Sequence, residues 1–184
     1  MSAASILVLP GHGDSGPDHW QSRWEAADSR LRRVVQRDWL EPKLDDWVAT
    51  LDRAVAVCPA PPVLVAHSLG CVLVAHWFQR TGRAVRGALL VAPVDVDAVA
   101  QVIPSVESFR AMPLVRLAFP SIVVASDDDI YTSITRAEAF ARAWGSRFVR
   151  LSRAGHINSA SGHGDWPEGR AWLEELVREA AGGR

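Results

Sequence analysis

Cysteine is scarce in this chain of 184 residues, which contains only two, Cys58 and Cys71. Their spacing matches neither a metal-binding motif nor a redox CxxC motif, so we expect two free thiols in a reducing compartment, the cytoplasm. No apolar run approaches the length needed to span a membrane. No charged segment precedes the short apolar run at the N-terminus, so no signal peptide is expected.

Excess charge of either sign is also lacking. The chain has 20 basic and 21 acidic residues, a net charge of −1, and the basic residues are scattered. This pattern excludes the electrostatic footprint of a nucleic-acid-binding protein. Internal repeats and low-complexity segments are absent as well. Hydrophobic residues make up 48% of the chain, enough for a core, and the length predicts one domain over residues 1–184.

Short apolar runs alternate along the chain with segments of helical periodicity. We expect strands at 5–9, 34–39, 62–66, 87–92, 121–126 and 147–151. We expect helices at 17–31, 45–55, 70–80, 135–144 and 166–181. This alternation predicts an α/β fold, with a mostly parallel sheet of about six strands and helices on both faces.

The turn that contains Ser68 is the most informative motif. An apolar strand leads into Ala66-His67-Ser68-Leu69-Gly70, and a helix of small residues follows. The pattern is typical of a nucleophile elbow, in which a strained turn lifts the serine hydroxyl above the edge of the sheet. The positions of Ala66 and Gly70 must be small because strand and helix nearly touch there. A buried serine in an ordinary turn is the plainer alternative.

Acidic and imidazole side chains follow the last two expected strands. Aspartates occupy 127–129 after the fifth strand, and His156 follows the sixth. Open α/β sheets place their sites at the carboxyl ends of strands, and the order Ser, Asp, His is that of an α/β-hydrolase. We therefore expect Ser68, Asp129 and His156 to form a catalytic triad.

Other residues compete for two of these roles. Asp129 is favoured as the acid because Ile130-Tyr131 follows it, whereas Asp127 is the main rival and is expected to stabilise the turn. His163 is the rival base but lies further from the strand end. His67 is expected to point away from the serine, because neighbouring strand side chains face opposite sides.

Backbone N–H groups would stabilise the oxyanion of an acyl-transfer reaction. We expect these donors to be Leu69, directly after the serine, and His12, in the glycine-containing loop after the first strand. Trp39 is either core, which we favour, or pocket wall. The candidate pocket residues are Gly11, Gly13, Trp39 and Phe109.

A long irregular segment, 93–120, separates the fourth and fifth expected strands. It carries Phe109 and other apolar residues among prolines. Segments of this length are usually functional or mobile. We expect it either to fold over the mouth of the site as a lid or to pack on the sheet as a surface helix.

These motifs together resemble the small single-domain serine hydrolases related to retinoblastoma-binding protein 9. The matching stretches are 9–13 with 19–20, 67–70, 126–131, and 155–158 followed by 164–167. The resemblance implies a compact, capless α/β-hydrolase fold and a Ser-Asp-His triad. Asp129-Ile130-Tyr131 departs from the usual Asp-Pro-aromatic pattern of that group.

The sequence thus predicts a cytoplasmic serine hydrolase that cleaves carboxylic esters, or thioesters or amides, through an acyl-enzyme intermediate. Its expected partner is a small-molecule ester or acyl substrate, with no nucleic acid, membrane, metal or organic cofactor involved. One alternative is a non-catalytic binding or scaffolding protein of the same fold. Another is an aminopeptidase-like or thioesterase activity on the same triad.

Overall fold

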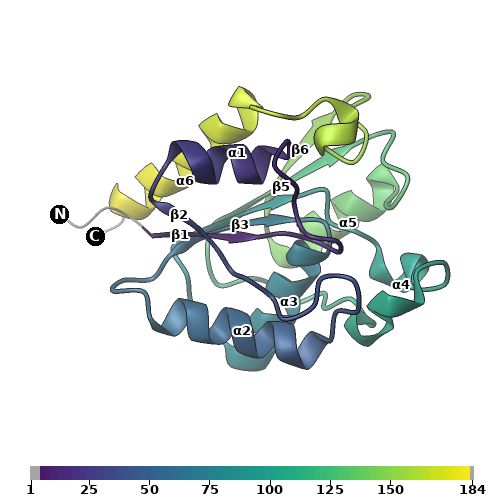
Figure 1. Ribbon diagram of the computed structural model, residues 1–184, viewed down its shortest axis with the longest axis horizontal. Helices are drawn as coiled ribbons and strands as arrows, with labels where there is room; N and C mark the ends of the chain where they lie inside the picture. Colours follow the sequence, from purple (N-terminus) through teal and green to yellow (C-terminus); the bar gives the residue numbers. More distant parts are fainter. Residues whose placement is uncertain (1–4, 183–184) are drawn as a thin grey trace.

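A computed structural model describes residues 5–182 and contains a sheet of six parallel strands (Figure 1). The strands, in the spatial order β2-β1-β3-β4-β5-β6, are β1 (Ile6–Leu9), β2 (Leu31–Arg33), β3 (Val63–His67), β4 (Gly87–Val91), β5 (Ser121–Ser126) and β6 (Arg147–Leu151). The inner strands β1, β3, β4 and β5 are buried throughout, as their continuous apolar runs require. The predicted α/β class is confirmed.

Helices cover both faces of the sheet (Figure 1). On one face, α1 (Trp20–Ala27) and α6 (Pro167–Gly182) bury their apolar sides. The other face is covered by α2 (Leu44–Ala56), α3 (Leu69–Thr81) and α5 (Ile134–Trp144). Two hydrophobic cores therefore lie on opposite sides of the sheet.

The second strand differs from the prediction. It lies at Leu31–Arg33 rather than 34–39, and the helix before it ends earlier than predicted, at Ala27. The Val34 N–H still donates to the Val8 carbonyl at 2.9 Å, but β1 then turns away from the sheet. Residues beyond this point have no neighbouring strand to pair with, so their β-like sequence does not form one.

The long segment 93–120 packs mainly on the protein. It contains the short helix α4 (Val96–Val99) and a 3₁₀ helix, η1 (Pro104–Phe109). Its apolar side chains Val106, Phe109, Met112, Leu117 and Phe119 belong to the core that contains α2, α3 and α5. A salt bridge from Arg136 of α5 to Asp95 at 3.0 Å also ties the segment down. Most of this segment thus follows the second of the two expectations, that it packs on the protein.

Tryptophans of α1 hold the loop that follows β6. The Trp20 indole N–H donates to the carbonyl of Ile157 at 2.8 Å, and that of Trp24 donates to the carbonyl of Asp165 at 2.8 Å. Both rings are buried, so each N–H needs such a partner. The helix therefore fixes the backbone beside His156.

The start of α3 packs closely on the end of β1, which generates a prediction about stability. A Cβ at Gly70 would overlap the Leu9 carbonyl oxygen and lie 2.9 Å from that of Pro10. Gly70→Ala should therefore lower the free energy of unfolding by about 1–3 kcal/mol, as overpacking does. The measurement is urea unfolding followed by tryptophan fluorescence.

Gly16→Ala is the matched control, because a Cβ at Gly16 would meet no atom within 4 Å. Its unfolding free energy should stay within about 0.5 kcal/mol of the wild type. Equal stabilities of the two variants would contradict the close packing at Gly70.

Candidate active site

Ser68 lies at the sharp turn between β3 and α3. Its backbone has φ 53° and ψ −119°, a conformation that a non-glycine residue adopts only when its surroundings enforce it. The Ser68 N–H donates to the carbonyl of Val91 at 3.0 Å, so the neighbouring strand β4 holds the turn in place. The structure thus has the strained strand-to-helix turn that the sequence predicts at this residue.

The loop after β1 lies directly against this turn. A Cβ at Gly11 would lie 2.9 Å from the Ser68 Cβ and 3.2 Å from the Leu69 backbone nitrogen. Leu69 is the first residue of α3, so its N–H has no partner within the helix. Within residues 5–182, neither this N–H nor that of His12 donates to a protein acceptor. Two backbone donors are therefore free beside the serine.

Asp129 and His156 meet at the carboxyl ends of β5 and β6. The His156 Nδ1 lies 2.8 Å from the Asp129 Oδ2, and the two side chains are only 12% and 2% exposed. The Asp129 Oδ1 accepts from the Tyr131 N–H at 2.9 Å, which fixes the carboxylate. An aspartate in this position holds the imidazole with its proton on Nδ1, leaving Nε2 free to accept one.

The two neighbouring aspartates hold the backbone of the His156 loop. Asp127 accepts from the Arg153 N–H at 2.9 Å, and Asp128 accepts from the Gly155 N–H at 2.8 Å. The pKa of the Asp127 carboxyl is lowered by that N–H and by Arg150. Hydrogen bonds from Ser126 and Gly155 lower the pKa of the Asp128 carboxyl.

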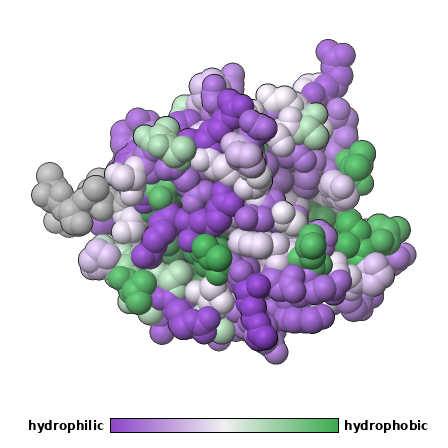
Figure 2. All heavy atoms as spheres, viewed as in Figure 1, coloured by the Kyte–Doolittle hydropathy of each residue, from purple (hydrophilic) through white to green (hydrophobic). Residues whose placement is uncertain are grey.

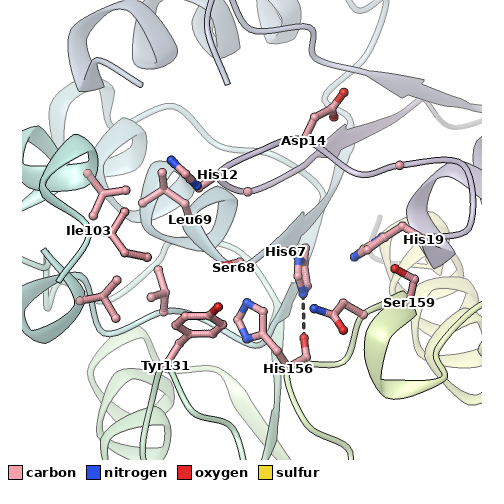
Figure 3. A pocket seen from close by; sticks show the side chains of 16 residues that line it. His12, Asp14, His19, His67, Ser68, Leu69, Ile103, Tyr131, His156 and Ser159 are labelled. Atoms are coloured by element: carbon pink, nitrogen blue, oxygen red, sulfur yellow. Dashed lines mark hydrogen bonds between the residues drawn. The ribbon is translucent and has the colours of Figure 1, made fainter. Parts of the chain in front are cut away.

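Two further imidazoles form a row of ring contacts with His156. The His67 ring lies 4.8 Å from the His156 ring, and the His19 ring lies 4.7 Å from that of His67. The His67 Nε2–H donates to the carbonyl of His156 at 2.9 Å (Figure 3). His67 therefore lines the cavity and supports His156 through this hydrogen bond. The sequence analysis expected its side chain to point away from Ser68.

Burial keeps these two imidazoles uncharged at neutral pH. It lowers the pKa of His67 well below the usual 6.5. Burial is also the main cause that lowers the pKa of His19 to about 4, and the charge of Arg33 adds to it. A charged imidazole in either place would have little water to solvate it.

Ser68 and His156 line a cavity of about 260 Å³ that has two unlike sides. One side is apolar and comes from the segment 93–120, with Val94, Val99, Ile103 and Val106. The other side is polar, with His19 and Ser159, and Asp14 and Asn158 are further polar residues that line the cavity. Figure 3 shows Ile103 on one side of Ser68, with His19 and Ser159 on the other.

The apolar side continues to the protein surface. Figure 2 shows hydrophobic side chains gathered over α4 and the turn after it. Val102, in that turn, is 78% exposed, and Ile130, which follows Asp129, is 84% exposed. The segment 93–120 thus supplies one wall of the cavity. A lid over the mouth of the site stays a prediction.

The predicted pocket residues are not all brought together. Gly11 lines the cavity, but Gly13, Trp39 and Phe109 are not among its lining residues. Phe109 is fully buried and packs on Trp47, with ring centroids 5.4 Å apart. Trp39 packs on the same ring at 5.4 Å, as the favoured core interpretation predicts. The core thus takes the two aromatic side chains that were candidates for the pocket wall.

Two other histidines have roles of their own. The His12 imidazole lies 3.0 Å from the Leu40 carbonyl and 3.1 Å from the Ser105 hydroxyl, so it links the loop after β1 to η1. His163 contacts the hydroxyl of Ser161 at 3.2 Å and is not among the cavity-lining residues. The structure therefore brings His156, and not His163, to the cavity.

Sequence reasoning missed several lining residues. His19 has one local feature that marks it, its position directly before α1. Its Nδ1 accepts a hydrogen bond from the Gln21 N–H at 3.2 Å. Asn158 has a comparable signal as the cap of the short helix η2 (Ser159–Ser161). Neither capping position predicts that the rest of the side chain faces a cavity. The apolar wall depends on how the segment 93–120 folds back.

Two searches of residues 5–182 concern other kinds of site. No group of three or more His, Cys, Asp and Glu side chains there could hold a metal ion. In the same residues, no helix has the length and apolar character to span a membrane.

Comparisons with known proteins agree with this architecture. The chain matches the serine hydrolase family over residues 6–175. YdeN of Bacillus subtilis (strain 168) is 22% identical over 175 residues, which cover 88% of this chain and 90% of that protein. A YdeN-like protein from Pectobacterium atrosepticum has a crystal structure with 33% identity and a TM-score of 0.85, covering 96% of this chain and 92% of that one.

A more distant solved structure shares the fold. The esterase RhEst1 from Rhodococcus sp. ECU1013 is 15% identical, with a TM-score of 0.69, and the match covers 96% of this chain and 90% of the esterase. The six-stranded parallel sheet is thus that of an α/β-hydrolase. Because the family match extends over nearly all of the sheet and its helices, the chain belongs to the serine hydrolase family and is a serine hydrolase enzyme.

Proposed function

We propose that this enzyme hydrolyses carboxylic esters with Ser68 as nucleophile, His156 as general base and acid, and Asp129 as the orienting carboxylate. One observation carries the proposal. The 2.8 Å contact between His156 Nδ1 and Asp129 Oδ2 is buried, and the ring lines the same cavity as the strained Ser68. A contact of this kind orients the base of a serine hydrolase.

The reaction begins when the Ser68 Oγ attacks the acyl carbonyl and its proton passes to the His156 Nε2. The carbonyl oxygen gains negative charge, which the backbone N–H groups of His12 and Leu69 stabilise. Collapse of the tetrahedral intermediate expels the alcohol, which takes the proton from His156. Water then attacks the acyl-enzyme by the same route and releases the acid. Asp129 stabilises the imidazolium in both halves.

The unliganded geometry is compatible with this sequence of steps. Within residues 5–182, no hydrogen bond links the Ser68 hydroxyl to His156. Such catalytic hydrogen bonds are often long until substrate binds. The apolar wall of the cavity is suited to the acyl chain. Thioesters and amides follow the same acyl-enzyme chemistry, so a substrate screen includes both beside esters.

Other parts of the proposal rest on the sequence. The matching motifs support kinship with the hydrolases related to retinoblastoma-binding protein 9 within the serine hydrolase family. Cys58 and Cys71 are free thiols, which supports the cytoplasm as the compartment. We take a small-molecule ester or acyl compound as the partner.

A fluorophosphonate probe should label the wild-type protein at Ser68, because such probes react with activated serine hydroxyls. Ser68→Ala should not be labelled, while its circular dichroism spectrum stays that of the wild type. Mass spectrometry of the labelled peptide checks the position. Labelling of a folded Ser68→Ala protein would contradict the proposed nucleophile.

His156→Ala should lose about three or more orders of magnitude in kcat on a short-chain aryl ester, as removal of a triad member does. His163→Ala is the matched control and should retain most of the activity, because that ring lies outside the cavity. Steady-state kinetics of the two purified variants test the assignment. A larger loss in His163→Ala would overturn it.

Asp129→Asn should lower kcat by about four orders of magnitude, because an amide in this position holds the wrong tautomer of His156. Asp127→Asn and Asp128→Asn should retain most activity, because each keeps an oxygen for the N–H donor of the His156 loop. All three melting temperatures are measured beside the rates. An inactive Asp127→Asn with an active Asp129→Asn would move the acid by two residues.

A further inference from the structure

The polar side of the cavity contains a histidine whose N–H has no acceptor. His19 is only 5% exposed, and its Nδ1 accepts from the Gln21 N–H at 3.2 Å. The Nδ1 therefore carries no proton, and in the neutral ring the proton lies on Nε2. This buried Nε2–H has no hydrogen-bond partner in the structure. Figure 3 shows a ring nitrogen of His19 directed toward the interior of the site.

Asn158, which lines the same cavity, has a similar arrangement. Its Oδ1 accepts from the Ser161 N–H at 3.1 Å as the cap of η2. This contact assigns the amide orientation, so the Nδ2 lies on the opposite branch. In the part of the chain that the structure describes, that Nδ2 donates to no protein acceptor. Asn158 is half-buried and His19 is fully buried, so the two donors lie at different depths.

The charges around these donors favour an uncharged ligand. His19 is neutral at pH 7 because burial lowers its pKa to about 4. Asp14 lines the same cavity, but its carboxylate is paired with Arg33 and so offers no free charge to a ligand. Arg33 is already paired with Asp14 at 2.8 Å and with Glu25 at 2.6 Å. Two neutral N–H donors therefore match a neutral acceptor, such as an ether, carbonyl or hydroxyl oxygen.

The position of the donors indicates which part of the substrate they meet. A leaving group must lie against the imidazole that protonates it, and Asn158 follows His156 closely in the same loop. His19 lies one ring further away, because the His67 ring contacts both the His156 ring and the His19 ring. The apolar side, with Ile103, lies across the cavity from His19 and suits the acyl chain (Figure 3).

We propose that Asn158 and His19 form a leaving-group subsite that binds a neutral hydrogen-bond acceptor on the alcohol part of the ester. Its ligands are esters with an apolar acyl chain and an alcohol that carries an ether, carbonyl or hydroxyl oxygen. The proposal rests on the ester hydrolysis proposed above and adds the residues that select the alcohol.

The test compares pairs of esters that differ by one oxygen in place of a methylene. On the alcohol side, the pair is 2-methoxyethyl butyrate and n-butyl butyrate. The acyl-side pair is n-butyl 3-methoxypropanoate and n-butyl pentanoate. We expect kcat/KM of the wild type to favour the ether about three- to tenfold in the first pair, which is the range for one neutral hydrogen bond. No such preference is expected in the second pair.

Two variants remove the donors but keep the caps. His19→Asn keeps an oxygen that can accept from the Gln21 N–H, because asparagine caps helices well. Its side chain is too short to place a donor in the cavity. Asn158→Asp retains the oxygen for the Ser161 N–H and replaces the amide donor. Each should bring the alcohol-side ratio closer to one. Because the ratio compares two substrates of the same protein, a general loss of activity or stability cancels. His163→Asn, outside the cavity, should keep the wild-type ratio.

Each outcome bears on a different claim. Hydrolysis of both alcohol-side esters at equal rates would overturn the subsite but not the triad. An ether preference only in the acyl-side pair, or a wild-type ratio in both variants, would also overturn it. Absence of both hydrolysis and fluorophosphonate labelling at Ser68 would refute the ester hydrolase itself. Where Ser68 is labelled but turnover is too slow, protection of Ser68 from the probe compares the affinities of the two esters, and the ether should again be favoured on the alcohol side only.

Discussion

The contact between the loop after β1 and the turn at Ser68 is the constraint on which the rest of the site depends. Ser68 keeps a strained backbone conformation with φ 53° because its N–H is bonded to β4 and because glycines let the neighbouring backbone pack closely around it. Gly70 lets α3 start against the end of β1, and Gly11 lets the next loop reach Ser68. The same two contacts bring the free N–H groups of His12 and Leu69 beside the hydroxyl. The proposed nucleophile and the proposed oxyanion donors thus have one structural origin.

The acidic loop at 127–129 positions His156, the proposed base, which belongs to a long loop. Asp129 contacts the His156 ring, while Asp127 and Asp128 accept from backbone N–H groups just before it. Adjacent carboxylates repel one another, but each of these has its own donors, which offset that cost. From the opposite side, the Trp20 N–H holds the residue after the histidine. The ring is therefore fixed by its acid, and its backbone by three other contacts.

The sequence contains most of the sheet and the chemistry of the site, but not the cavity walls. Buried strands such as β3 are evident because both faces are covered, so their residues are apolar without alternation. The prediction placed strand β2 too late in the sequence. The end of β2 depends on where its partner β1 ends, and the local sequence of β2 does not contain that information. The triad candidates were found because each residue directly follows a recognisable strand.

The walls depend on tertiary packing. Phe109 is a large apolar residue in the expected segment, yet it packs on Trp47, while the smaller Val106 faces both core and cavity. His19 and Asn158 each cap a helix. Their second polar atoms enter the cavity only because α1 and the loop after β6 meet there. Such a juxtaposition leaves no periodic signal in the chain.

The row of three imidazoles gives the site its electrical asymmetry. If His67 were charged, it would oppose a second charge on His156, because the two ring centroids are only 4.8 Å apart. A charged His19 would act on His67 in the same way, at 4.7 Å. Burial prevents this by lowering the pKa of both rings, and the His67 Nε2–H is committed to the His156 carbonyl. Only His156 has a carboxylate at its Nδ1, which would stabilise the imidazolium formed during acyl transfer. In the proposed mechanism, the proton of Ser68 therefore passes to one ring of the three, while His67 stays neutral and donates to the His156 backbone. His19 likewise stays neutral and is the donor of the proposed subsite.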